Sequence, residues 1–249
     1  MTKQAGIKTE NIKVAAKIDL NKIEQWLRKE YEKEGQGFFS NKDIVIDNFY
    51  KNQLFVYIIN NFPVGFITGP FDGPSILNVN KDFQGIGVGT RLFEYILNKA
   101  IKNKIDVIKI QCKPETSVGF WEKMGFTIHE KHEHSYGYMI IEYKNNILSG
   151  EKIKVVINTY SDDNDEEVLS TYEPIAFLNK NKSITLAERL FLFEKTLFEQ
   201  FGKDLIVSVV INGEEIYKDK AKREKAKDIG INKSRHDYGY FIDNIKLNS

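Results

Sequence analysis

In roughly the first 145 residues, segments with a helical pattern of apolar residues alternate with segments that have the pattern of β-strands. After Asp19-Leu20-Asn21, apolar side chains recur at spacings of three and four, which predicts an amphipathic helix that ends near Gly35. A shorter helix is expected over residues 41–50. The β-prone runs at 54–59 and 64–67 are separated by Asn60-Asn61-Phe62-Pro63, and we expect them to form an antiparallel hairpin.

After this hairpin the spacing of apolar residues changes from that of strands to that of a helix. A short strand is expected at 75–79, a helix from about Gly87 with apolar residues through Ala100, and a strand at 105–110. A strand, a turn, a helix and a returning strand make a βαβ crossover. Beyond Pro114 we expect a short helix that ends at Gly125 and then two strands up to Tyr143. The pattern predicts an α/β fold.

A polar, turn-prone stretch at 144–150 marks the expected boundary between a domain over residues 1–145 and a smaller C-terminal α/β domain over 150–249. In the second domain we expect strands at 152–160, 172–178 and 205–211. Thr185-Leu186-Ala187-Glu188 resembles a capping box, which predicts a helix that buries Leu190, Phe193, Leu197 and Phe201.

Composition narrows the class of protein. The 249 residues include 36 Lys and Arg against 35 Asp and Glu, so the net charge of +1 gives no overall attraction to nucleic acid or anionic lipid. Cys112 is the single cysteine, which fits a reducing compartment. No apolar run approaches the ~20 residues that a membrane span needs. We expect a soluble, cytoplasmic protein that binds neither membrane nor nucleic acid.

The most informative stretch is Gln84-Gly85-Ile86-Gly87-Val88-Gly89-Thr90, at the start of the helix that follows the strand at 75–79. Glycines allow tight turns, and the first N–H groups of a helix favour an anion, so this is a candidate phosphate-binding turn. A P-loop requires a lysine after its last glycine, and a dinucleotide fingerprint requires glycine where Thr90 stands. Both of these spacings are absent, and a plain helix start is the remaining alternative.

The spacing of Gln84, Gly87 and Gly89 resembles the Q/R-x-x-G-x-G/A signature of the GNAT (GCN5-related) acetyltransferase superfamily. A second match, Phe120-Trp121-Glu122-Lys123-Met124-Gly125-Phe126, is similar to the F-Y-x-K-x-G-F segment of that family. The two motifs occur in the family's order, on the expected elements, within about the first 145 residues. The resemblance therefore implies a GNAT-like mixed sheet flanked by helices.

The resemblance implies an N-acetyltransferase that uses acetyl-CoA and no metal. The backbone amides of Gln84, Gly85, Ile86, Gly87, Val88 and Gly89 would hold the pyrophosphate, with the hydroxyl of Thr90 nearby. The pantetheine arm would lie along Leu77, Asn78 and Val79. A small-molecule or peptide amine would attack the thioester directly in a ternary complex. The alternative is a non-catalytic GNAT-fold module that binds coenzyme A or a protein partner.

Trp121 departs from the family pattern, which often has tyrosine there as the acid that protonates the leaving thiolate. An indole N–H is a donor with negligible acidity, so Trp121 is expected to form a wall beside the coenzyme. Tyr136 and Tyr138, on one face of a strand, are the replacement acids we predict, and Glu115 is a candidate base. An enzyme with no dedicated acid is the alternative, because a thiolate leaves readily.

A group of histidines and the single cysteine are both expected to have structural roles. His129, His132 and His134 are separated by charged and polar residues and lack further ligands, so no metal site is expected. Cys112 is expected to be a small core residue.

The second domain shows a faint repeat of the first. His134-Ser135-Tyr136-Gly137-Tyr138 recurs as His236-Asp237-Tyr238-Gly239-Tyr240, about 100 residues later. One hypothesis is a degenerate copy of the GNAT C-terminal half without its phosphate turn, and the alternative is chance. A copy of this kind would bind a substrate, a protein partner or the sister subunit of a homodimer. Neither the acceptor nor the oligomeric state follows from the sequence.

Overall fold

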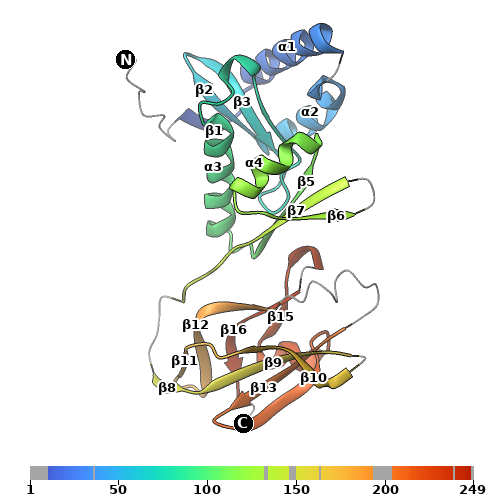
Figure 1. Cartoon of the computed structure of the whole chain (residues 1–249). Coiled ribbons are helices and arrows are strands. Elements are labelled where there is room, and N and C mark those ends of the chain that lie inside the picture. Colours follow the sequence, from blue (N-terminus) through green and yellow to red (C-terminus); the bar gives the residue numbers. More distant parts are fainter. Residues whose placement is uncertain are drawn as a thin grey trace, which may run out of the picture. The chain divides into compact units, whose positions relative to one another are not determined.

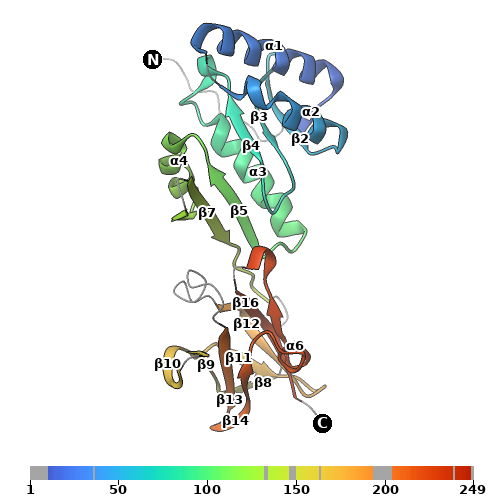
Figure 2. The ribbon, with the colours of Figure 1, turned by 90° about the vertical axis from the view of Figure 1, so that its right-hand side faces the viewer.

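The computed structural model describes residues 11–35, 37–131, 134–145, 150–162, 164–192, 204–237 and 239–247. It divides into two compact units, which we call unit 1 (Met1–Met139) and unit 2 (Ile140–Ser249). Figure 1 and Figure 2 show unit 1 in blue to green and unit 2 in yellow to red.

Unit 1 begins with a four-stranded antiparallel sheet of β1 (Ile12–Val14), β2 (Leu54–Ile59), β3 (Phe62–Thr68) and β4 (Ile76–Val79). Helices α1 (Lys17–Glu34) and α2 (Lys42–Tyr50) share a core with one face of this sheet, and α3 (Val88–Lys102) shares a core with the other. Alternation along β2 explains both cores, because Leu54 and Val56 face α1 while Phe55 and Tyr57 face α3. The short 3₁₀ helix η2 (Phe38–Asn41) joins α1 to α2.

A second sheet completes unit 1, with strand order β5 (Val107–Cys112), β7 (His134–Ile140) and β6 (Thr127–Lys131). The 3₁₀ turn η4 (Glu115–Ser117) and the helix α4 (Val118–Lys123) lie between β5 and β6 in the chain. In the described part of the chain, β4 and β5 belong to different sheets. A crossover that starts from β4 and returns as β5 therefore leaves a gap in backbone pairing between those two strands.

Gly65 on β3 sets how closely α3 packs on the first sheet. A Cβ at this position would lie 2.8 Å from Val88 Cγ1 and 3.2 Å from Leu92 Cδ1. Both distances are below ordinary van der Waals contact, so only glycine lets the start of α3 approach at this separation. The N-terminal end of α3 is thereby held close to β3 and β4.

Unit 2 consists mainly of two antiparallel sheets around one core. One has the order β10 (Asn164–Tyr172), β9 (Val155–Ser161), β13 (Leu205–Ile211) and β14 (Glu214–Lys220). The other has the order β15 (Ile231–Lys233), β16 (Tyr240–Lys246), β12 (Ser183–Leu192), β11 (Ala176–Leu178) and β8 (Glu151–Ile153). Ile157 and Val209 from the first sheet and Ile184 and Ile242 from the second are fully buried in the shared core. The helix α6 (Glu224–Ile229) contributes Ala226 to it.

The predicted helix that starts at Thr185 is wrong, because residues 183–192 form the strand β12. The Thr185 hydroxyl donates to Asn244 Oδ1 on β16 at 2.7 Å instead of capping a helix. Ile184 and Leu186 are both fully buried, which is the period of two of a strand. Phe193, Leu197 and Phe201, which that prediction also named, lie outside the described residues.

The hypothesis of a degenerate GNAT half in unit 2 is also wrong. In unit 1 the relevant segment runs from β4 through the 15-residue helix α3 to β5. The described residues of unit 2 contain no comparable crossover, and their strands form two all-antiparallel sheets. The repeated His-x-Tyr-Gly-Tyr letters fall on β7 in unit 1, whereas in unit 2 they begin on the 3₁₀ turn Arg235–Asp237.

Candidate functional site

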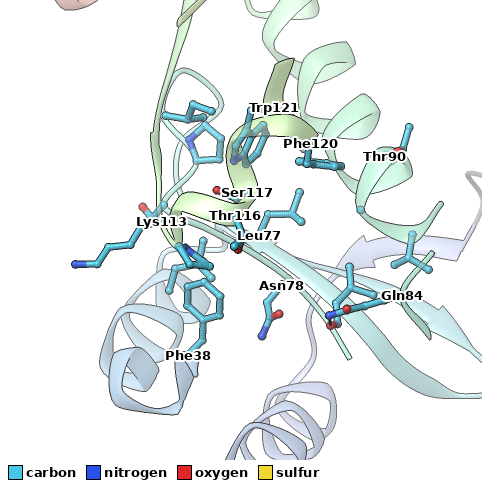
Figure 3. A pocket seen from close by; sticks show the side chains of 18 of the residues that line it. Phe38, Leu77, Asn78, Gln84, Thr90, Lys113, Thr116, Ser117, Phe120 and Trp121 are labelled. Carbon is cyan, nitrogen blue, oxygen red and sulfur yellow. Dashed lines mark hydrogen bonds between the residues drawn. The ribbon is translucent and has the colours of Figure 1, made fainter. Parts of the chain in front are cut away.

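A cavity of about 580 Å³ lies in unit 1, bordered by β4, β5, the start of α3 and α4. Figure 3 shows residues from these elements around it, with Gln84 and Thr90 on one side of the view and Phe38 and Lys113 on the other. Its lining comprises Phe38, Pro74, Ser75, Ile76, Leu77, Asn78, Val79, Phe83, Gln84, Gly85, Gly87, Val88, Gly89, Thr90, Ile110, Gln111, Lys113, Pro114, Thr116, Ser117, Phe120 and Trp121. The cavity thus lies where β4 and β5, which belong to different sheets, do not pair.

The glycine-rich turn presents free backbone donors to this cavity. Gly87 is the N-cap of α3 in the left-handed conformation (φ 87°), and no side chain caps the helix. Arg91 N donates to Gly87 O at 3.1 Å, so Val88, Gly89 and Thr90 precede the first intrahelical bond. A Cβ at Gly85 or Gly87 would meet nothing within 4 Å. The positive end of the α3 dipole therefore opens onto free space, as an anion-binding turn requires.

The edge of β4 offers a second set of backbone groups. Asn80 N donates to Val64 O on β3 at 2.8 Å, and bonding direction alternates along an antiparallel strand. The N–H groups of Leu77 and Val79 therefore point away from β3, toward the gap. Gln84 Nε2 donates to Val79 O at 3.0 Å, which ties the glycine-rich turn to the end of the strand.

The structure brings together most of the predicted coenzyme-binding residues. Ten of them line the cavity, namely Leu77, Asn78, Val79, Gln84, Gly85, Gly87, Val88, Gly89, Thr90 and Trp121. Ile86 does not line it, and its side chain is 49% exposed. Trp121 packs edge-on against Phe93, Phe120 and Phe126, at centroid distances of 5.6, 4.9 and 5.3 Å. The indole thus belongs to an aromatic cluster and borders the cavity as well.

The three predicted catalytic residues are not part of the cavity lining. The Ser135 hydroxyl donates to Glu115 Oε1, which directs that carboxylate toward β7. Tyr136 lies under the Lys109 ammonium, 5.6 Å from its ring centroid, and stacks on His129. Tyr138 is 7% exposed. In this structure, therefore, none of the three residues lines the cavity.

Several lining residues were not predicted from the sequence. Phe38 comes from η2, far from the glycine-rich turn in the chain. A second group comes from the end of β5 and the residues after it, namely Gln111 within the strand and Lys113, Thr116 and Ser117 beyond it. The signal that could have found the second group is its position at and after the end of a strand that returns from the crossover, because ligand sites of α/β folds lie at the carboxyl ends of strands. Phe38 carries no comparable sequence signal.

Two side chains of unit 1 have a pKa raised by burial. Burial raises the pKa of Glu30 on α1, opposed by the Lys81 N–H, which donates to Glu30 Oε1 at 3.3 Å, and by the Lys81 charge. Burial, together with the charges of Glu115 and Glu122, raises the pKa of the Cys112 thiol, whose residue is 2% exposed. A buried thiol of raised pKa is a poor nucleophile, so the interpretation of Cys112 as a core residue agrees with its burial.

Within the described residues, no three His, Cys, Asp or Glu side chains are grouped so that they could hold a metal ion. His132 lies outside those residues. Among the described helices, none combines the length and the hydropathy that a membrane span would require.

The sequence matches the model of a known protein family. Residues 28–146 match the model of the acetyltransferase (GNAT) domain, which includes the glycine-rich turn and the whole cavity lining. The segment of residues 28–146 is a GNAT acetyltransferase domain. It is therefore an acyltransferase, and residues 147–249 lie outside the matched segment.

The GNAT domain is also similar to solved structures. They include a GNAT-family acetyltransferase from Staphylococcus aureus Mu50 (16% identity, TM-score 0.44, 52% of this chain and 98% of that one). A PaiA N-acetyltransferase from Thermoplasma acidophilum in complex with coenzyme A has 14% identity and a TM-score of 0.44, covering 52% of this chain and 98% of that one. A polyamine N-acetyltransferase from Drosophila melanogaster has 10% identity and a TM-score of 0.42, covering 52% and 99%. None of the curated proteins compared with the chain matches it.

Proposed function

We propose that the GNAT domain transfers an acetyl group from acetyl-CoA to an amine by direct attack within a ternary complex. The cavity supports this proposal, because it joins an uncapped helix start at Gly87 to the open edge of β4. The helix start offers backbone donors to a pyrophosphate, and the open strand edge offers backbone groups to the amides of a pantetheine arm.

The residues present fit acetyl-CoA in two further respects. Open space at Gly85 and Gly87 leaves room for phosphate oxygens next to the backbone. Leu77, Phe120 and Trp121 give apolar walls to the middle of the cavity, where an alkyl arm would lie. Thr90 adds a hydroxyl at the phosphate end.

In the proposed reaction the amine nitrogen attacks the thioester carbonyl carbon, the C–S bond breaks and the thiolate of coenzyme A leaves. Val79 or Leu77 would donate its backbone N–H to the oxyanion that forms, since both N–H groups point toward the gap. The cavity walls would hold the amine and the thioester in contact, which reduces the entropic part of the barrier.

Proton transfer is proposed to occur without a dedicated acid. Among the described residues, those lining the cavity include no Asp, Glu, His, Tyr or Cys. Water would take the proton of the attacking amine, and the thiolate would leave unassisted. Roles for Tyr136, Tyr138 and Glu115 stay predictions, as do binding by Ile86, a homodimer and a cytoplasmic location.

The test has two parts, both on the full chain. Calorimetry with coenzyme A should show one binding site, and free thiol should be released from acetyl-CoA when an amine is added. Binding without thiol release across a broad amine panel would contradict the transferase proposal and favour a binding module. Absence of binding by folded protein would contradict the assignment of the cavity itself.

A further inference from the structure

The charges around the cavity bear on which amine the enzyme acetylates. Among the described residues, Lys113 is the one charged side chain of the lining, and no carboxylate is present. An amine acceptor that carries further positive charges requires carboxylates to bind it, because an unpaired charge loses hydration on entering a cavity. The charged residue of the described lining is instead a lysine, which carries the same positive sign as such an acceptor.

Lys113 lies away from the end of the cavity assigned to the pyrophosphate. Figure 3 shows Lys113 and Phe38 on the side of the view opposite Gln84 and Thr90, with the Lys113 side chain extending outward from the rim. Lys113 is exposed, and its four-carbon stem can turn toward a ligand at the mouth. Its charge is therefore better placed to meet the acceptor than the phosphates of the coenzyme.

Three carboxylates of unit 1 are engaged elsewhere. Glu115 accepts from the Ser135 hydroxyl, Glu30 accepts from Lys81 N at 3.3 Å, and Glu34 pairs with the Lys81 ammonium. None of these three carboxylates lines the cavity. The described lining thus combines one cationic residue with apolar residues that include Phe38, Ile76 and Ile110. The charges of Glu115 and Glu122, which act on the Cys112 thiol next to Lys113 in the chain, come from outside this lining.

From this arrangement we infer that the acceptor is a small amine with an anionic group beside an apolar one, as in a free amino acid with an apolar side chain, and that it is not a polyamine. This inference rests on the proposed acetyl transfer. Lys113 acts as a specificity-determining residue that pairs with the carboxylate of the acceptor. The amine then reaches the thioester near β4.

The test compares acceptors that differ only in the carboxylate. Phenylalanine with phenethylamine and leucine with 3-methylbutylamine are two matched pairs, and 1,4-diaminobutane represents polyamines. The wild-type protein should give a higher kcat/KM with the amino acids than with 1,4-diaminobutane. Lys113→Gln should lower the ratio of kcat/KM within each matched pair about fivefold, since an exposed charge pair is worth up to about 1 kcal/mol.

The control variant is Lys102→Gln, which removes an exposed charge at the far end of α3 and should leave both ratios unchanged. Ratios within one enzyme cancel any general loss of activity. A preference for 1,4-diaminobutane, or an unchanged ratio in Lys113→Gln, would overturn this inference while leaving acetyl transfer intact. Failure of every acceptor to release thiol would instead contradict the proposed function, and this inference with it.

Discussion

Unit 1 and unit 2 both pack antiparallel sheets against apolar cores, but they differ in how neighbouring strands pair. In unit 1, β4 and β5 bound a crossover and belong to separate sheets, and the cavity lies where they fail to pair. In unit 2, the central strands β9 and β12 are each paired on both sides. Backbone groups left free between strands can bind a ligand, whereas paired ones stabilise the sheet. The strand edge that borders the described cavity is thus a feature of unit 1.

The largest expected effect tests whether the two units are independent. Ile242 is fully buried between β12 and β15, so Ile242→Ala should lower the free energy of unfolding of unit 2 by about 3 kcal/mol. Urea unfolding measures this change, and the affinity for coenzyme A should stay the same. Ile216→Ala is the matched control, because Ile216 is 38% exposed and its truncation should cost less than about 0.5 kcal/mol. Loss of coenzyme affinity in Ile242→Ala would mean that unit 2 supports the site.

A smaller effect tests the free donors of unit 1. Gly87→Ala places a Cβ on a residue with φ 87°, which should cost about 1 kcal/mol of stability and weaken coenzyme A binding about tenfold. Gly35→Ala is the control, because Gly35 also has positive φ (69°) and open space around its Cβ but does not line the cavity. Calorimetry and thermal unfolding should show equal strain in both variants and weaker binding in Gly87→Ala alone. If Gly87→Ala and Gly35→Ala bound coenzyme A with equal affinity, the glycine-rich turn would not be part of the binding site.

The smallest expected effect concerns pH and unit 2. Burial raises the pKa of Tyr217 to about 12 from an ordinary value of 10, and its hydroxyl donates to Lys220 O at 3.2 Å. Because the folded state keeps the proton longer than the unfolded state, this stabilisation is complete below pH 10 and is lost as the pH rises toward 12. The stability difference between the wild type and Tyr217→Phe should therefore shrink over that range. A constant difference in urea unfolding would show that the phenol titrates normally.

The sequence predicted unit 1 well because its signals are local and agree with one another. The strand at 54–59 is β2, and the helix expected to end near Gly35 ends there with Gly35 in the left-handed conformation. Ten of the eleven predicted coenzyme-binding residues line one cavity, because the turn and the strand before it are adjacent in the chain. Phe38 and Lys113 reach the same cavity only through tertiary packing, which periodicity does not reveal.

Unit 2 shows where local signals fail. The capping box at Thr185–Glu188 is a pattern of four residues, and long-range pairing with Asn244 and its neighbours on β16 outweighs it. Helix propensity differs by less than about 1 kcal/mol per residue between most side chains, so burial of Ile184 and Leu186 decides the outcome. The likeness of the His-x-Tyr-Gly-Tyr letters likewise gave no information about topology.

Gly65 illustrates how the shape of a cavity can depend on a residue that does not line it. The missing side chain on β3 permits the start of α3 to settle against the sheet, with Val88 and Leu92 as its nearest neighbours. A methyl group there would meet the Val88 and Leu92 side chains, so these side chains would have to shift. The packing of the start of α3, which borders the cavity, therefore depends on a residue outside the cavity lining.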